Sequence, residues 1–243
     1  MGRLIGIETD IGNKRTFNED SVGYYEGDDI SVYIVADGMG GHNAGEVASR
    51  MAKDIVIDYV VSHQEASDVK ETLKEAINSA NLKIYKESII NDDCKGMGTT
   101  MVVALVRGCD LIIANIGDSR AYILNDNGLT KVTKDHSLVQ ELLDNGTITG
   151  EEAQNHPNKN VITRAVGTNT SVEADYYNLD VREISRVILC SDGLTNEVSE
   201  EEILQIMMED QNEQCMQLIN RSKENGGRDN VSVIIFKGEC EVR

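Results

Sequence analysis

The sequence is poor in positive charge and in several structure-marking residues. Its 243 residues include no tryptophan, two phenylalanines and one proline, Pro157. The 23 Lys and Arg residues are outnumbered by 42 Asp and Glu residues, which gives a formal net charge of −19. Nucleic acids and anionic membranes attract basic surfaces, so this charge argues against both as partners.

Long apolar segments are also missing. The longest uninterrupted apolar run, Met101 to Val106, has six residues, whereas a membrane-spanning helix needs about 20. The first residues, Met1 to Glu8, contain no signal-peptide apolar region and predict a strand. We therefore expect a cytoplasmic protein that does not associate with membranes.

Cysteine is present without a recognisable spacing. The five cysteines are odd in number and far apart, and no CxxC or Cys/His ligand pattern occurs, which argues against a zinc site. We expect all of them to be free thiols in a reducing compartment: Cys94, Cys109, Cys190, Cys215 and Cys240.

The chain is long enough to bury a substantial core. At about 150 residues per domain its length corresponds to one or two domains, and 40% of its residues are hydrophobic, which excludes a fully disordered acidic protein. No Pro/Ser/Gly-rich linker and no internal repeat divides it, so we expect residues 1–243 to form a single domain.

Two kinds of element alternate along the chain. Helical periodicity covers Ala44 to about Ser62 and about Asp68 to Ile90, and short helices are expected after Ser137, Thr149 and Ser199. Hairpin-like strand pairs predict an α+β fold with largely antiparallel sheets. The strands are expected at Val- and Ile-rich runs bounded by Gly, Asp or Asn: 4–7, 31–36, 99–106, 111–116, 120–124, 129–133, 187–190 and 231–236.

Four aspartates flank four of these apolar runs. Asp37, Asp118 and Asp192 follow a run, Asp229 precedes one, and Glu19-Asp20 lies near the first strand pair. Turn chemistry explains any one of them, but explains the whole set poorly. Clustered carboxylates repel one another unless a cation neutralises them, and oxygen ligands favour Mg²⁺, Mn²⁺ or Ca²⁺. No EF-hand loop pattern is present.

The segment from Asp37 to Glu46 is the densest in glycine. It does not match the dinucleotide pattern GxGxxG, because Asn43 replaces the third glycine, and no Walker lysine follows. It is either a flexible turn or a place where the Gly38 backbone approaches an ion. His42 and Arg15 are ordinary surface residues when taken alone; beside a cation site, Arg15 could grip a phosphate with two parallel hydrogen bonds.

In their order, these motifs strongly resemble the PP2C-type (PPM) metal-dependent serine/threonine protein phosphatases in their compact bacterial form. The similarity extends over nearly the whole chain, and the ordered set is far more specific than any single motif. The matching segments are Arg15-Thr-Phe-Asn-Glu-Asp20, Asp37-Gly-Met-Gly-Gly-His-Asn-Ala-Gly-Glu46, Gly98-Thr-Thr100, Gly117-Asp-Ser-Arg120, Ser191-Asp-Gly193 and Gly227-Arg-Asp-Asn-Val231.

The resemblance implies an α-β-β-α sandwich: two packed, mostly antiparallel sheets flanked by helix pairs, with a flap at about 145–168. It implies two Mn²⁺ or Mg²⁺ ions in a cleft at one edge of the sandwich. Asp37 would bridge the ions, and the Gly38 carbonyl would bind one of them. The other implied ligands are Asp192 and Asp229, Glu19 and Asp20 directly or through water, and Asp118 at a third, weaker metal position.

The resemblance also implies an activity and a mechanism. A hydroxide bridging the two ions would hydrolyse phosphoserine or phosphothreonine in proteins without a phosphoenzyme. Arg15 would hold the phosphate, and His42 would be the general acid for the leaving alkoxide. A cognate serine/threonine kinase would be the opposing enzyme, and we expect a monomer.

Two alternatives remain open from the sequence. A catalytically silent module with this fold would bind metal weakly and turn over no phosphopeptide, although the intact carboxylate set argues against it. A different divalent-metal hydrolase, such as a nuclease, is disfavoured by the acidic surface; a comparison of nucleic acid with phosphopeptide as substrate distinguishes the two.

Overall fold

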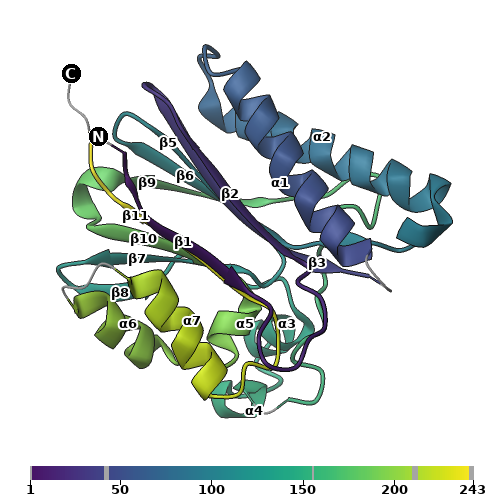
Figure 1. Cartoon of the computed structure of the whole chain (residues 1–243), viewed down its shortest axis with the longest axis vertical. Helices are drawn as coiled ribbons and strands as arrows, with labels where there is room; N and C mark the ends of the chain where they lie inside the picture. Colours follow the sequence, from purple (N-terminus) through teal and green to yellow (C-terminus); the bar gives the residue numbers. More distant parts are fainter. Residues whose placement is uncertain (1, 41–43, 155, 210–212, 241–243) are drawn as a thin grey trace.

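The chain forms two stacked sheets with helices on both outer faces, and the computed structural model describes residues 2–40, 44–154, 156–209 and 213–240. Figure 1 shows four layers, with α1 and α2 over one sheet and α6 and α7 over the other. The predicted α+β class and the α-β-β-α sandwich are confirmed.

The first sheet has the strand order β2-β3-β5-β6-β9, with the short β4 paired to β3. The second has the order β1-β11-β10-β7-β8. Every pairing between these strands is antiparallel, as predicted. The strands are β1 (Leu4–Asp10), β2 (Asp20–Glu26), β3 (Ile30–Met39), β4 (Gly98–Thr99), β5 (Met101–Arg107), β6 (Asp110–Ile116), β7 (Arg120–Asn125), β8 (Gly128–Lys131), β9 (Asp175–Asp180), β10 (Arg186–Cys190) and β11 (Val231–Lys237).

The helices occupy the outer layers and one end of the sandwich. They are α1 (Ala44–Ser62), α2 (Val69–Ile90), α3 (Leu138–Asp144), α4 (Gly150–Gln154), α5 (Asp192–Thr195), α6 (Glu200–Met208) and α7 (Gln214–Glu224). Two 3₁₀ turns are η1 (Asp92–Cys94) and η2 (Val181–Glu183). Side chains between the two sheets form the central core, in which the rings of Tyr33 and Phe236 stack with centroids 3.9 Å apart.

The predicted helix starts are confirmed in detail. The side chains of Asp68 and Ser137 cap α2 and α3. Ser199 and Glu202 form a reciprocal capping box at α6, because each side chain accepts a hydrogen bond from the other's backbone N–H.

Some elements escaped prediction. The edge strand β9 has the sequence Asp-Tyr-Tyr-Asn-Leu-Asp and no residue that is fully buried, so it lacks a strong apolar pattern. The run 99–106 is divided at Thr100 into β4 and β5. In the described part of the acidic stretch 197–213, the helix α6 covers Glu200–Met208. Glu197 is not solvated, because its side chain is 3% exposed and pairs with Arg228 at 2.7 Å.

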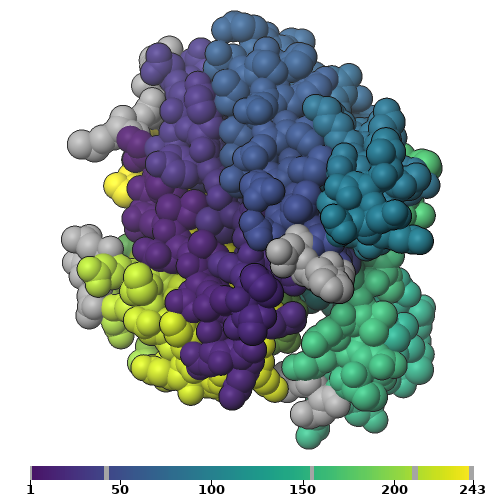
Figure 2. Space-filling view, turned by 45° about the vertical axis from the view of Figure 1, so that its right-hand side comes forward, coloured from purple at the N-terminus to yellow at the C-terminus, as the bar shows by residue number. Residues whose placement is uncertain are grey.

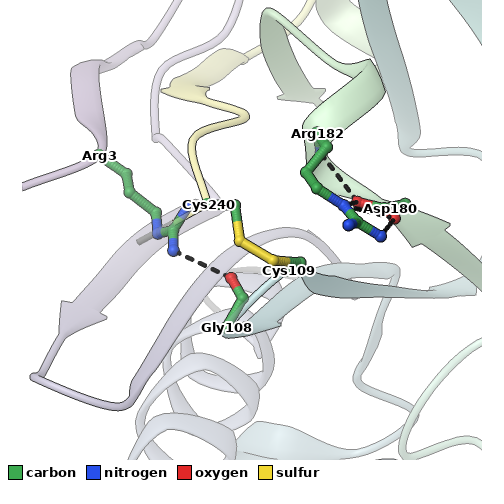
Figure 3. Close-up of a disulfide and its surroundings, with 6 residues drawn as sticks. All are labelled: Arg3, Gly108, Cys109, Asp180, Arg182 and Cys240. Carbon is green, nitrogen blue, oxygen red and sulfur yellow. Dashed lines mark hydrogen bonds and ion pairs between the residues drawn. A yellow bond between two sulfur atoms is a disulfide. The ribbon is translucent and has the colours of Figure 1, made fainter. Parts of the chain in front are cut away.

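The expectation that all five cysteines are free thiols is wrong for two of them. A disulfide joins Cys109, in the β5–β6 turn, to Cys240, which follows β11 in the chain (Figure 3). Their separation of 131 residues hides the pairing in the sequence. Cys94, Cys190 and Cys215 are free and buried.

Within the described part of the chain, no helix combines the length and apolar character needed to cross a bilayer.

Candidate metal centre

The centre begins with two aspartates that face each other across a strand pair. Asp20 opens β2 and lies directly opposite Asp37, close to the end of β3. Opposed residues of antiparallel strands point to the same face of the sheet, and like charges in such a pair destabilise it. The fold therefore places the carboxylates of Asp20 and Asp37 together at one end of the sandwich. The sequence predicted that carboxylates would cluster because they lie near strand ends, but it did not predict this pairing.

Asn230 organises the loop that carries Arg15 and Glu19. Its buried side chain accepts the Glu19 backbone N–H at 2.9 Å and donates to the carbonyl oxygens of Ile11 and Phe17 at 3.0 and 2.9 Å. These three hydrogen bonds tie the β1–β2 loop to the start of β11. These hydrogen bonds therefore fix the position of Glu19 and allow Arg15 to reach Asp229.

Asp192 and Asp118 enter from two further elements. Asp192 is the first residue of α5, two residues after the end of β10, and accepts a hydrogen bond from Asn196 at 2.8 Å. Asp118 lies in the β6–β7 turn. Ser119, the next residue, is hydrogen-bonded to Thr100 at 2.7 Å, and the Thr100 hydroxyl accepts the Asp37 N–H at 3.0 Å. The turn that holds Asp118 is thus linked directly to the end of β3.

Two serines hold Asp20 in place. The hydroxyls of Ser191 and Ser232 donate to the same carboxylate oxygen, Oδ2, at 2.8 and 2.6 Å. The other oxygen, Oδ1, is buried without a hydrogen-bond partner. Asp20 therefore presents one fixed oxygen to the protein and leaves the other available for a ligand.

The electrostatics of the group reflect buried carboxylates at close quarters. Burial and the nearby Asp192 and Asp229 raise the pKa of Asp20 to about 7, although the serine hydroxyls lower it in part. Burial, Asp20 and Asp192 raise the pKa of Asp37 well above its usual range. Burial and Asp192 raise the pKa of Asp118 to about 8. At neutral pH such a group gains from a cation, which would favour the ionised forms.

Two further members of the group respond to the same surroundings. Burial and Asp229 raise the pKa of Asp192. Burial also raises the pKa of Glu19, although Arg15 and the Gly45 amide oppose the rise.

Arg15 supplies a positive charge beside Asp229, Asp37 and Glu19. Its Nη2 donates to Asp229 Oδ2 at 2.8 Å, and both side chains remain partly exposed. Burial lowers the pKa of Arg15, but the Asp229 contact and the charges of Asp37 and Glu19 outweigh it, so the pKa rises. Arg15 therefore stays charged and lies at the mouth of the carboxylate group, a pairing that the sequence did not predict.

Unpartnered oxygens show that the group suits a hard cation. Four buried carboxylate oxygens have no hydrogen-bond partner: Glu19 Oε1, Asp20 Oδ1, Asp118 Oδ1 and Asp192 Oδ1. Buried charged oxygens without partners are costly, and oxygen-only sets are those that Mg²⁺ and Mn²⁺ prefer. Among the described residues, no three His, Cys, Asp or Glu side chains converge closely enough to enclose an ion. The unpartnered oxygens and the oxygen-only donor set of the group therefore fit a hard cation in their chemistry.

Gly38 lies where backbones cross. Its N–H donates to the Glu19 carbonyl at 3.1 Å, and a Cβ at this position would overlap the Gly45 carbonyl and crowd that of Glu19. Only glycine permits this close approach, which explains the glycine directly after Asp37.

The expected residues fall into two groups. The structure brings together Arg15, Glu19, Asp20, Asp37, Gly38, Asp118, Asp192 and Asp229. His42 lies outside the described residues. The sequence reasoning gave no role to Asn230, Ser191 and Ser232, although the first two directly adjoin Asp229 and Asp192; this adjacency was the available signal.

Comparison with known proteins shows which family the chain belongs to. The family model described as Protein phosphatase 2C matches residues 12–227. The chain belongs to the protein phosphatase 2C family. It is thus an enzyme of the phosphatase class, as the sequence predicted.

Individual relatives cover nearly the whole chain. It is 40% identical over 237 residues to the serine/threonine phosphatase stp of Listeria welshimeri, covering 95% of this chain and 94% of that protein. The crystal structure of serine/threonine phosphatase Stp1 from Staphylococcus aureus superposes with a TM-score of 0.88 at 36% identity, covering 98% and 95% of the two chains.

One solved relative contains metal. The catalytic domain of the serine/threonine protein phosphatase PstP, described in complex with two manganese ions, matches with a TM-score of 0.82 at 36% identity and covers 96% of both chains. This chain therefore shares its fold with a phosphatase that is described with two manganese ions bound.

Proposed function

We propose that this chain hydrolyses phosphoserine and phosphothreonine in proteins at a binuclear Mn²⁺ or Mg²⁺ centre, and that residues 1–243 form one catalytic domain. The observation that carries the proposal is the group of buried carboxylates with four unpartnered oxygens. Relatives named serine/threonine phosphatases support the substrate class, and a manganese-containing relative supports the cofactor.

Each ligand role rests on a position in this group. Asp37 would bridge two ions, with the Gly38 carbonyl on one ion and Asp192 and Asp229 on the other. Glu19 and Asp20 would bind directly or through water, and Asp118 would serve a third, weaker ion. When bound, the ions would supply a bridging hydroxide at neutral pH and positive charge opposite the phosphoryl oxygens.

The role of Arg15 is to bind and orient the substrate phosphate. A guanidinium has five N–H donors, and the Asp229 contact uses Nη2, so the remaining donors can engage phosphate oxygens in a bidentate manner. By resemblance to the family, His42, five residues after Asp37 in the sequence, would donate the proton to the leaving alkoxide.

Substrate side chains next to the phosphate would occupy a groove beside the flap. A cavity of about 660 Å³ lies between the flap residues Gly150 and Lys159 and the α5–α6 connection at Asn196. Asn196 contacts Asp192, so this groove adjoins the carboxylate group. Figure 2 shows a separate hollow between the N-terminal loop, in purple, and the green flap region; the described lining of the groove itself begins at Arg120.

Another cavity is less suited to this role. It measures about 780 Å³ and lies beside Arg3, Glu26 and Arg107, at the opposite ends of β2 and β5 from the carboxylates. Because it lies at the far end of these strands from Asp20 and Asp37, a substrate bound there would not reach the proposed metal centre.

The partners and location follow from the same proposal. The substrates would include phosphoproteins made by a cognate serine/threonine kinase, and the enzyme would act as a cytoplasmic monomer. Disulfides are rare in reducing compartments, so a cytoplasmic location predicts that Cys109 and Cys240 are thiols in the cell. Rapid alkylation of acid-quenched cells measures the free thiols. If Cys109 and Cys240 are fully oxidised and do not react with the alkylating reagent, the cytoplasmic location is wrong.

The activity is tested with a phosphothreonine peptide in the presence of Mn²⁺. Phosphate release should be abolished by EDTA and restored by added Mn²⁺. Asp192→Asn should lower turnover at least 100-fold, because it removes a charged ligand, while Asp58→Asn on the exposed side of α1 should leave it unchanged. Metal-independent turnover, or wild-type turnover in Asp192→Asn, contradicts the assigned centre. Cleavage of single-stranded nucleic acid but not of phosphopeptide would identify a nuclease instead.

A further inference from the structure

His136 is a buried histidine outside the proposed ligand set, and its two ring nitrogens face different parts of the protein. The side chain is 7% exposed. Its Nδ1 accepts the backbone N–H of Gly117 at 3.1 Å. On the other side of the ring, Nε2 lies 3.2 Å from Asp175 Oδ2 and 3.1 Å from Arg164 Nη1. Gly117 directly precedes Asp118, so one nitrogen of His136 contacts the turn that carries a proposed metal ligand.

The backbone of His136 strengthens this contact. Its N–H donates to the Gly117 carbonyl at 2.8 Å, so His136 engages both polar backbone groups of Gly117. Asn115, at the end of β6, adds a second link to the segment before His136, because its side chain donates a hydrogen bond to the Lys134 carbonyl at 3.1 Å. The Gly117–Asp118 turn is thus held from one side by the segment around His136.

The same segment holds the end of the flap. The carbonyl of His136 accepts the Thr163 N–H at 2.9 Å, and the Leu138 N–H donates to Val161 at the same distance. Three residues after Thr163, Val166 exchanges two backbone hydrogen bonds with Thr99. The returning strand of the flap is therefore fixed to His136 before it reaches β4.

Asp175 completes the connection through side chains. Its Oδ1 accepts a hydrogen bond from Arg164 Nη1 at 2.9 Å, while its Oδ2 faces His136. Arg164 also donates to the Glu173 carbonyl at 3.0 Å. Arg164, at the base of the flap, thus contacts His136 both directly and through Asp175, and His136 in turn contacts Gly117.

We propose that His136, as the neutral tautomer with its proton on Nε2, is a positioning residue that couples the base of the flap to the Asp118 turn. This inference rests on the proposed function for its effect on catalysis, but its structural part does not. Nδ1 must be unprotonated to accept the Gly117 N–H, so the proton of the neutral ring is on Nε2, which faces Asp175 Oδ2. The neighbouring Arg164 Nη1 does not need Nε2 as an acceptor, because its two protons have the Asp175 Oδ1 and the Glu173 carbonyl. The metal centre and the flap would consequently share one positioning element.

The surroundings agree with a neutral ring. Burial lowers the pKa of His136, although the hydrogen bond with Asp175 opposes the effect, and the charge of Arg164 lowers it further. Partial burial raises the pKa of Asp175, but its hydrogen bonds to His136 and Arg164 outweigh burial, so the pKa is lowered overall. Asp175 therefore remains an ionised acceptor beside a neutral donor.

Two substitutions separate the two contacts of the ring. His136→Asn keeps an acceptor at the δ position for Gly117 but is too short to reach Asp175. His136→Gln keeps a donor at the ε position for Asp175 but removes the δ acceptor. His63→Gln is the matched control, because His63 lies exposed at the C-terminal end of α1.

The first test is nuclear magnetic resonance of the metal-free protein, with histidine labelled by nitrogen-15. The His136 ring, assigned by its loss in His136→Asn, should show the Nε2–H tautomer. Hydrogen exchange of the Gly117 amide should accelerate at least tenfold in His136→Gln and less than threefold in His136→Asn. An Nδ1–H tautomer, or equal Gly117 exchange in both variants and the wild type, overturns the proposal.

The second test is a double-mutant cycle on phosphopeptide turnover. His136→Gln should lower kcat at least fivefold in the wild-type background and less than twofold in Asp118→Asn, because a residue that acts through Asp118 loses its effect when Asp118 is changed. If His136→Gln lowers kcat by the same factor in both backgrounds, His136 does not act through Asp118 and the proposed coupling is wrong. If the wild type has no phosphatase activity, the proposed function fails, while the exchange and tautomer measurements still decide the positioning role.

Discussion

Asp20→Asn should stabilise the metal-free protein at alkaline pH. Asp20 lies opposite Asp37 and is 7% exposed, and burial and the neighbouring carboxylates raise its pKa to about 7. A raised pKa means that the folded state binds the proton more tightly than the unfolded chain. Stability therefore falls as the pH rises from the ordinary value of 3.8 to about 7.

The size of the effect follows from that difference. A rise from 3.8 to about 7 corresponds to about 4 kcal/mol, since each tenfold change in proton affinity is worth about 1.4 kcal/mol. Asparagine can still accept from Ser191 and Ser232, but its buried amide costs about 1–3 kcal/mol to desolvate. The net gain at pH 8 should be about 1–3 kcal/mol, or about 2–12 °C in melting temperature.

Thermal unfolding followed by circular dichroism, in EDTA at pH 4.5 and pH 8, measures this gain. The advantage of Asp20→Asn should be present at pH 8 and should shrink toward zero at pH 4.5, where Asp20 is protonated in the folded protein. With saturating Mn²⁺ the order should reverse, because the variant lacks a carboxylate ligand.

A control with the opposite sign is available in the same chain. Asp10 pairs with Lys223 at 2.8 Å, and although partial burial opposes the effect, this hydrogen bond lowers its pKa. Asp10→Asn should therefore destabilise at pH 8, with or without metal. If Asp20→Asn is less stable than the wild type at pH 8 without metal, or if its advantage does not depend on pH, the electrostatic reasoning is wrong.

Three further predictions concern the scaffold. Gly193→Ala places a Cβ against the Asn230 carbonyl and should cost about 1–3 kcal/mol in urea unfolding through overpacking; an unchanged midpoint would show that the backbone yields freely. Asn230→Ala removes three hydrogen bonds from the β1–β2 loop and should raise KM for a phosphopeptide severalfold as Arg15 loses its placement, with trypsin cleavage of the loop as a second readout. Cys240→Ser opens the disulfide across 131 residues and should cost about 2–4 kcal/mol in oxidised protein but nothing in excess reductant, so a cost that persists in reductant would assign it to packing.

Local signals account for much of what could be predicted. The N-caps of α2 and α3 and the capping box of α6 depend on residues within one helical turn, so Asp68, Ser137 and Ser199 identify them. Strands buried on both faces, such as β5 and β11, are rich in apolar residues and can be predicted from the sequence alone. The edge strand β9 has no such run, because its place depends on pairing with β6.

The candidate site divides in the same way. Asp37, Asp118, Asp192 and Asp229 could be singled out because strand ends mark them in the chain. The contact of Arg15 with Asp229 joins residues 214 positions apart, and Ser191 and Asp20 lie 171 positions apart. No spacing in the sequence encodes such contacts, so the hydrogen bonds that hold the site could not be read from it.

The sequence by itself determined the family, the α+β class and the set of carboxylates, because apolar runs, caps and ordered motifs are local and are written in adjacent residues. The tertiary structure alone decided the cross-strand pairing of Asp20 with Asp37, the Cys109–Cys240 disulfide and the contact of His136 with Gly117. These features depend on the register of antiparallel strands and on burial, which exist only when distant segments pack together. The raised pKa values of the buried aspartates arise for the same reason, since proximity and desolvation are properties of the folded chain.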